Sequence, residues 1–252
     1  MAFRNNEGRY WEIDFIRGIA LLFMIGFHLL YDLKLFGVIN WNLYSGILFF
    51  IAYGTASTFI LVAGISASLR YHHLRQISVP ISFVHSFIKR GIKILFLGFI
   101  ITLVTLLFIP EQYVIFGILH CMGISTILCI PFLGYKKINV LLGSFLILIG
   151  IILRMYTFDF SFLIPFGFIP HMFSTVDYFP LLPWFGVFLI GITMGHIWYP
   201  QGMRKHLIHD YSGLLVIKRI CAFGTNSLYV YFLHQPLLFA VIFLFLYFFP
   251  AS

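Results

Sequence analysis

The chain has 252 residues, of which 61% are hydrophobic and 10% are charged, and its mean hydropathy is +1.00. Soluble domains carry charge on about a quarter of their residues, so this composition excludes a soluble globular protein and indicates an integral membrane protein. The formal net charge of +8 comes from basic residues that flank apolar segments. This distribution indicates a membrane topology and gives no reason to expect a nucleic-acid partner.

Seven apolar segments each approach the length of about 20 residues that a membrane-spanning helix needs. We therefore predict an all-α, polytopic bundle of about seven transmembrane helices. The bundle is expected to form a single domain over residues 1–252, because the polar loops are too short to fold alone. In chain order the predicted spans are residues 15–37, 46–69, 91–109, 114–133, 138–156, 180–199 and 225–249.

A further apolar segment, residues 160–173, is short and contains Pro165, Gly167 and Pro170. Proline interrupts a helix, and irregular backbone is tolerated at membrane depth only where protein or water covers it. We predict a re-entrant or interfacial segment here, with an ordinary structured loop as the alternative.

The sixteen Lys and Arg residues fall almost entirely on one side of this topology, and only Lys34 and Arg154 lie on the other. Because basic residues collect on the cytoplasmic side, we predict a cytoplasmic N-terminus and an outer C-terminus. For a prokaryotic chain this describes a multi-pass protein of the cell membrane. The connection between the second and third spans is rich in basic residues, and such a positive rim can bind anionic lipid headgroups or a polyanion such as a nucleotide.

The first predicted span carries four ionisable residues on one face: Asp14, Arg17, His28 and Asp32. At about 100° per residue, the step from Arg17 to His28 returns to within roughly 20° of the same direction. The stripe rises on the order of 27 Å along the helix. An ionisable group in the hydrocarbon costs several kcal/mol unless it faces protein or water, so the stripe is a candidate functional site.

Two more histidines lie in predicted spans: His120 in the fourth, and His234, followed by Gln235-Pro236, in the last. On the predicted topology they reach a depth similar to that of His28, so the three can converge. A histidine with an aspartate four residues on can donate one ring N–H to the carboxylate and keep the other nitrogen as a base. For His28 with Asp32 this predicts general-base or acyl-transfer chemistry, and a structural interhelical pair is the alternative.

Five ordered motifs carry a family resemblance: Trp11-Glu-Ile-Asp14-Phe-Ile-Arg17-Gly18-Ile-Ala20, Phe27-His28-Leu-Leu-Tyr-Asp32-Leu, Phe116-Gly-Ile-Leu-His120, Asp177-Tyr-Phe-Pro-Leu-Leu-Pro-Trp184 and Ser227-Leu-Tyr-Val-Tyr-Phe-Leu-His234-Gln-Pro236. Over about residues 9–240 the chain resembles the prokaryotic membrane family related to the catalytic domain of heparan-alpha-glucosaminide N-acetyltransferase. More distantly, its first helix is similar to the opening motif of the membrane acyltransferases that O-acetylate surface polysaccharides.

The resemblance implies an acyl-CoA-dependent N- or O-acetyltransferase. It implies that acetyl-CoA binds on the cytoplasmic side and that its acetyl group passes to an amine or hydroxyl of a sugar-type acceptor on the far side. The lysosomal enzyme of this family has its active histidine just beyond the first catalytic-domain helix, whereas residues 37–45 of this chain contain none. We therefore predict direct transfer in a ternary complex rather than an acetyl-histidine intermediate.

The residue patterns and the resemblance together give expected roles to individual residues. The predicted catalytic residues are His28, Asp32, His120 and His234. The predicted cofactor-binding residues are Arg17, Arg70, Lys89, Arg90 and Lys93. The predicted acceptor-binding residues are Asp177, Trp184 and Trp41. Aromatic rings suit sugar stacking, although membrane-interface anchoring is the commoner role of Trp.

A proton-coupled membrane transporter is the alternative function, because intramembrane His and Asp residues also relay protons. The chain shows no inverted repeat, and seven spans do not divide into equal halves, which disfavours a transporter. No metal is expected, because the three cysteines lack metal-ligand spacing and no zinc-protease helix is present. The expected partners are the lipid bilayer, acetyl-CoA and the acceptor, and a homodimer is an option that the sequence leaves open.

Overall fold

The computed structural model describes residues 9–43, 45–77 and 80–248, and within these the chain forms eight α-helices and three short 3₁₀ turns without a β-strand. The chain divides into two compact units. One unit joins Met1–Phe59 to Ile208–Ser252, and the other is the continuous stretch Ile60–Leu207. We call them the terminal unit and the central unit.

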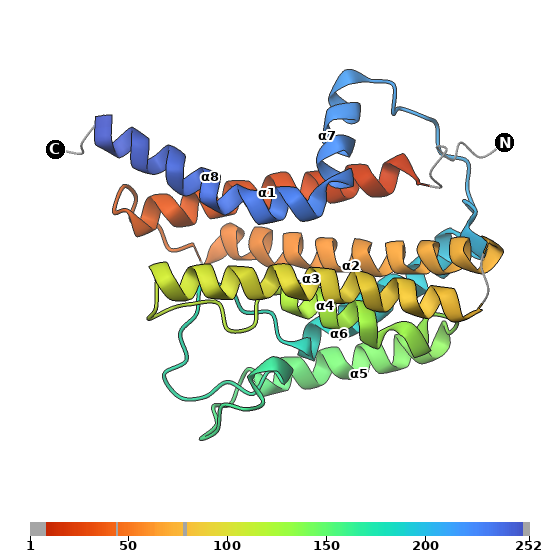
Figure 1. Ribbon diagram of the computed structural model, residues 1–252, viewed down its shortest axis with the longest axis horizontal. Coiled ribbons are helices and arrows are strands. Elements are labelled where there is room, and N and C mark those ends of the chain that lie inside the picture. Colours follow the sequence, from red (N-terminus) through yellow and green to blue (C-terminus); the bar gives the residue numbers. More distant parts are fainter. Residues whose placement is uncertain (1–8, 44, 78–79, 249–252) are drawn as a thin grey trace. The chain divides into compact units, whose positions relative to one another are not determined.

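The terminal unit is built on two long apolar helices, α1 (Trp11–Leu35) and α8 (Ser227–Phe248), which run side by side (Figure 1). They run in the same direction, because residues farther along α1 meet residues farther along α8, starting with His28 and His234. The rings of Phe36 and Phe239, for example, lie with their centroids 5.6 Å apart just beyond the end of α1. This unit also contains the first part of α2 (Gly46–Ile77).

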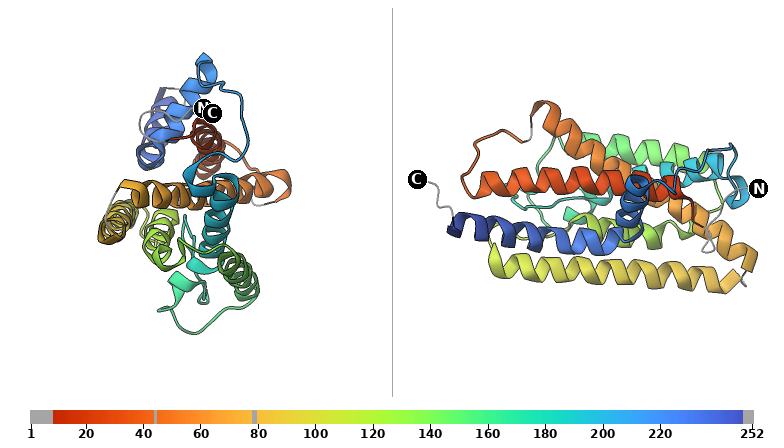
Figure 2. Two further views of the ribbon diagram at one scale, coloured as in Figure 1. Left: turned by 90° about the vertical axis from the view of Figure 1, so that its right-hand side faces the viewer. Right: turned by 90° about the horizontal axis from the view of Figure 1, so that it is seen from above.

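A short helix, α7 (Leu215–Thr225), precedes α8 and lies crosswise to both α1 and α8 (Figure 1 and Figure 2). Two glycines allow its backbone to touch that of α1. A Cβ atom on Gly18 would overlap the carbonyl oxygen of Ile220, and one on Gly224 would overlap the carbonyl oxygen of Asp14. Small residues of this kind are what let membrane helices approach closely.

The central unit contains the second part of α2 together with α3 (Pro80–Phe108), α4 (Ile118–Leu128), α5 (Lys137–Leu153) and α6 (Leu181–Trp198). Helix α6 is the most buried of the long helices. It packs on α2, where a Cβ on Gly64 would overlap the Phe188 carbonyl, and on α5, where a Cβ on Gly143 would lie 2.8 Å from the Gly186 carbonyl oxygen. Its glycines thus place it at the core of this unit.

All seven predicted apolar segments contain helix within the described residues, which confirms a helical membrane protein. Five helices, α1, α2, α3, α6 and α8, are long and apolar enough to cross a membrane. Helices α4 and α5 are apolar but shorter, with 11 and 17 residues. The count of seven spans, the cytoplasmic N-terminus and the single-domain organisation therefore stay predictions.

Residues 160–173 form no α-helix and contain one 3₁₀ turn, Ile164–Phe166, which ends at Gly167 with a left-handed φ of 103°. The Tyr178 hydroxyl donates a hydrogen bond to the Ile164 carbonyl at 2.7 Å. Burial raises the pKa of Tyr178, which keeps this hydroxyl protonated as a donor. The irregular backbone agrees with the prolines and glycine of the segment, while a re-entrant position stays a prediction.

Replacing Gly224 by alanine should separate α7 from α1, because the added methyl group has no space. Overpacking of this kind typically costs about 1–3 kcal/mol, so we expect a clear fall in the melting temperature of the protein in detergent. Gly26→Ala is the matched control on α1, since nothing lies within 4 Å of a Cβ there. An equal effect of the two substitutions would contradict the close α1–α7 packing.

Candidate functional site

Helices α1 and α8 bring His28 and His234 together in the terminal unit. Their ring centroids lie 4.8 Å apart, and the ring planes meet at 81°. His234 is buried, and its Nε2 atom has no hydrogen-bond partner among the described residues. The predicted convergence of these two histidines is therefore present within this unit.

Backbone carbonyls fix the tautomers of both rings. His28 Nδ1 lies 2.9 Å from the Met24 carbonyl oxygen, and His234 Nδ1 bonds the Tyr231 carbonyl oxygen. Because a carbonyl oxygen can only accept, Nδ1 carries the hydrogen in each ring. In the neutral state each Nε2 atom then carries a lone pair, which is the form that acts as a base.

Asp32 lies one turn beyond His28 on α1 and is completely buried. Its Oδ1 atom accepts a hydrogen bond of 2.7 Å from Gln235 Nε2 on α8. The predicted pairing of His28 with Asp32 is thus replaced by two other contacts: His28 bonds Met24, and Asp32 bonds Gln235. Helical side chains lean toward the N-terminus of the helix, which directs the His28 ring to the preceding turn.

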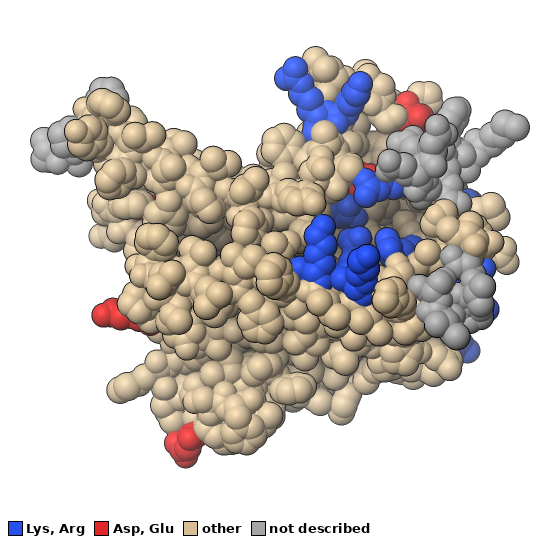
Figure 3. All heavy atoms as spheres, in the orientation of Figure 1, with Lys and Arg blue, Asp and Glu red and all other residues tan. Residues whose placement is uncertain are grey.

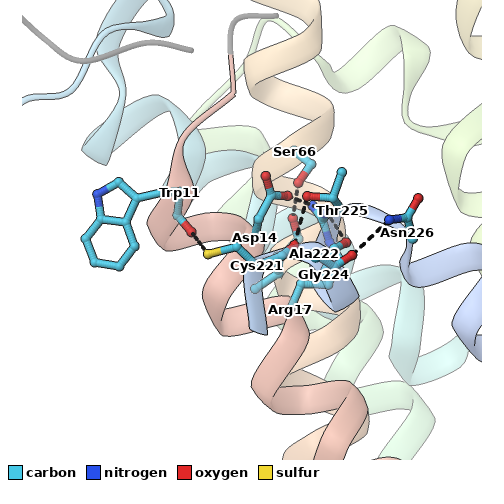
Figure 4. A network of polar contacts seen from close by, with 10 residues as sticks. Trp11, Asp14, Arg17, Ser66, Cys221, Ala222, Gly224, Thr225 and Asn226 are labelled. Carbon is cyan, nitrogen blue, oxygen red and sulfur yellow. Dashed lines mark hydrogen bonds and ion pairs between the residues drawn. The ribbon is translucent and has the colours of Figure 1, made fainter. Parts of the chain in front are cut away.

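Arg17 and Asp14 lie at the junction of α1 with α7 (Figure 4). Arg17 Nη1 donates to Asp14 Oδ1 at 3.0 Å and to the Gly224 carbonyl oxygen at 3.2 Å. Carbonyls in the last turn of a helix carry partial negative charge, so the guanidinium stabilises the C-terminus of α7 as well as the buried carboxylate. In this structure Arg17 holds two helices together, and its predicted contact with the cofactor stays a prediction.

In the central unit, His120 and Asp177 meet at the N-terminus of α4. Asp177 Oδ2 accepts the Ile118 amide at 3.1 Å, and the Gly117 amide donates to His120 Nδ1 at 3.3 Å. The carboxylate therefore caps α4 and complements its dipole. Glycine is required at position 117, because a Cβ there would overlap the Asp177 carboxylate.

His120 has the opposite tautomer to the histidines of the terminal unit. Its Nδ1 accepts a hydrogen bond from an amide, so Nε2 carries the hydrogen in the neutral ring. The side chain is 3% exposed, lies against Phe99 and Phe116, and has no partner for Nε2 among the described residues. Neutral His120 is thus suited to donate a hydrogen bond, whereas the predicted base chemistry suits His28 and His234.

The four predicted cofactor-binding residues of the central unit lie where α2 ends and α3 begins. The Arg70 guanidinium donates to Ser86 Oγ and so ties α2 to α3, while Lys89, Arg90 and Lys93 are exposed. Figure 3 shows the resulting concentration of Lys and Arg over the N-terminal half of α3. This surface offers positive charge to an anionic ligand or to lipid headgroups.

The two predicted acceptor-binding tryptophans differ in environment. Trp184 is buried at the start of α6, with its ring 5.0 Å from that of Phe179, whereas Trp41 is exposed in the loop after α1. Packing accounts for Trp184, and acceptor binding by either tryptophan stays a prediction. Among the described residues, no group of three or more His, Cys, Asp or Glu side chains is placed to hold a metal ion.

Comparison with known families gives a match over most of the chain. The family model described as "Heparan-alpha-glucosaminide N-acetyltransferase, catalytic" matches residues 9–236 of the chain. The chain belongs to this family. The resemblance carried by the five motifs is thereby confirmed, and membership in the N-acetyltransferase family implies an acetyltransferase-type enzyme. No curated protein and no solved structure matches the chain.

Sequence reasoning did not assign a role to Gln235 or to Gly117, although both lie inside the family motifs. Gln235 directly follows His234, and Gly117 lies three residues before His120. An amide next to a buried histidine is the available signal for Gln235, because buried polar groups need partners. The contact of Gly117 with Asp177 joins distant parts of the chain and leaves no local signal.

Asp177→Ala should destabilise the protein, since α4 loses its N-terminal acceptor. Loss of such a cap costs roughly 0.5–2 kcal/mol, which thermal unfolding in detergent can detect. Asp159→Ala is the control, because that side chain is 98% exposed and pairs with His171 of the same loop. Asp177→Asn keeps an acceptor oxygen, so its melting temperature should lie between those of D177A and the parent protein. Equal stability of D177A and the parent protein would contradict the cap.

Proposed function

We propose that the protein is a transmembrane acetyltransferase that takes an acetyl group from acetyl-CoA on the cytoplasmic side. It transfers this group to an amine or hydroxyl of a sugar-type acceptor on the outer side. Family membership supports acetyltransferase chemistry. The His28–His234 pair is the observation that supports placing the transfer reaction at this site. Two imidazoles with Nε2 lone pairs meet there between two long apolar helices.

In the proposed reaction the acceptor nitrogen or oxygen attacks the thioester carbon of acetyl-CoA. A bond forms between that atom and the acetyl carbon, the C–S bond breaks, and the acceptor loses a proton. His28 is proposed to take this proton on Nε2, with His234 beside it to share the positive charge. The proton then passes to the CoA thiolate, which gives the CoA thiol, or to water. Either transfer returns the histidine to its neutral form.

Asp32 is proposed to act as a positioning residue. It bonds Gln235, the neighbour of His234, so the hydrogen bond holds α8 in the register that sets one histidine against the other. A fully buried carboxylate without a partner is costly, and this cost opposes any shift of α8 that would separate the rings.

The cofactor is proposed to bind through the exposed basic residues Lys89, Arg90 and Lys93, with Arg70 and Arg17 as further cations. CoA carries several phosphate charges, and ammonium and guanidinium groups are the usual protein partners of phosphate. The clustering of Lys and Arg in the last turns of α2 and the N-terminal half of α3 supports a cytoplasmic position for this end of the central unit. The same rule supports a cytoplasmic N-terminus and an outer C-terminus.

Direct transfer in a ternary complex is the proposed kinetic scheme. It requires that acetyl-CoA and CoA do not exchange their acetyl group until the acceptor is bound. Rapid exchange between acetyl-CoA and labelled CoA without acceptor would instead support an acetyl-enzyme intermediate.

Purified protein should be stabilised by acetyl-CoA. A ligand that binds only the folded state at a hundredfold excess over its dissociation constant contributes about 2.7 kcal/mol, which gives a measurable thermal shift. ADP and ligand-free buffer are the controls. No shift at millimolar acetyl-CoA would contradict the proposal, and proton movement by the protein in liposomes would then favour a transporter.

His28→Ala and His234→Ala should each lower acetyl transfer by at least about 100-fold, the usual contribution of a positioned base. The thermal shift by acetyl-CoA should persist in both variants, because neither histidine is assigned to the cofactor. His206→Ala, on an exposed side chain, is the control. Unchanged transfer by the double variant H28A/H234A would exclude this pair as the site.

A further inference from the structure

Helix α7 is too short to cross a membrane and lies in the wrong direction to do so. Its 11 residues span about 16 Å at 1.5 Å per residue, against a hydrocarbon core of about 30 Å. It stands crosswise to α1 and α8, which are both candidate spans, and it meets α1 near the start of that span (Figure 1 and Figure 2). With α1 and α8 as spans, the axis of α7 is parallel to the plane of the membrane.

One face of α7 is fixed to α1. Ile220 and Gly224 form the backbone contacts with Gly18 and Asp14, and Cys221 Sγ lies 3.4 Å from the Trp11 carbonyl oxygen (Figure 4). These contacts settle which side of the short helix faces the protein. Ile217 is half-buried on the same side, and the other side chains of α7 are exposed.

Two flanks of the outward surface differ in polarity, and exposed Leu215 and Ala222 lie between them. Val216 is 69% exposed and Phe223 is 42% exposed, and at about 100° per residue they lie within roughly 20° of each other around the helix. Lys218 and Thr225, both exposed, occupy a direction roughly 160° away. Exposed Arg219 also lies between these flanks, nearer the apolar one, and α7 contains no acidic residue.

We propose that α7 is an interfacial helix that binds anionic phospholipids. Val216 and Phe223 enter the boundary of the acyl chains, while Lys218 and Arg219 bind the headgroup phosphates. Large apolar side chains on one flank, with one basic residue beside them and one on the opposite flank, are typical of a helix in a membrane interface. A soluble polyanion would use the two cations and leave the apolar flank in water, so a lipid accounts for more of the exposed side chains.

The position of α7 can be measured with single cysteines on the full chain in nanodiscs of phosphatidylcholine and phosphatidylglycerol. Cys221→Ser removes the partly exposed native thiol, and Cys121 and Cys129 are completely buried. Spin labels at positions 216 and 223 should collide mainly with oxygen, and labels at 218 and 225 mainly with a soluble nickel chelate. Equal nickel access at all four positions would overturn the proposal.

Headgroup selectivity can be measured at the same helix. A fluorophore on cysteine at position 216 should be quenched more by brominated phosphatidylglycerol than by brominated phosphatidylcholine, relative to their mole fractions. This preference should fall to the bulk ratio in K218Q/R219Q, with about fivefold per basic residue as the upper limit. K136Q/K137Q, which removes the same charge elsewhere, should keep the preference.

Two further outcomes separate the lipid from the cofactor. The acetyl-CoA thermal shift should be unchanged in K218Q/R219Q. If that shift is lost while the lipid preference at position 216 persists, these residues bind the cofactor and the lipid proposal is wrong. Quenching at position 216 of the parent protein in proportion to the bulk ratio of the two lipids would also overturn the lipid proposal, whatever the acetyltransferase measurements show.

Discussion

The hydrogen bond between Asp32 and Gln235 is the contact on which the geometry of the terminal unit depends. A fully buried carboxylate needs a donor, and within the described part of the chain Asp32 accepts its hydrogen bond from Gln235 on α8. Shifting α8 by one residue would rotate Gln235 by about 100° and leave the carboxylate unpaired. Because His234 precedes Gln235, the same register brings its ring against His28. A polar pair thus selects one arrangement where apolar packing alone would allow several.

Much of the helical framework follows from composition, because an apolar segment near membrane length has few alternatives to a helix. The ends are harder to predict. Helix α2 continues beyond its apolar segment to Ile77, and helix α3 begins before its apolar segment, at Pro80. Residues with charged side chains can extend a helix into water once the helix has begun. Helix α7 was not predicted at all. Its 11 residues mix apolar and basic side chains, and its position depends on glycine contacts with α1.

The candidate site could be predicted in its residues but not in its contacts. Helical spacing predicts the face on which His28 and Asp32 lie. The similar depth predicted for His28 and His234 in the membrane predicts that they meet. Spacing cannot give the direction of a side chain along the helix, so the partners Met24 and Gln235 were not foreseen. The tautomer of His120 likewise depends on one backbone amide, at Gly117, whose position is set by the local turn.

The two segments that make up the terminal unit are separated in the sequence by the whole central unit. During synthesis α1 enters the membrane early, with His28 and Asp32 already in place, while Gln235 and His234 are still untranslated. Domains generally fold in the order in which they leave the ribosome, and here the central unit can complete its own contacts first. The polar side chains of α1 must meanwhile be tolerated in the bilayer without their final partners. Helix α8, which is made after the central unit, therefore completes the polar contacts of α1.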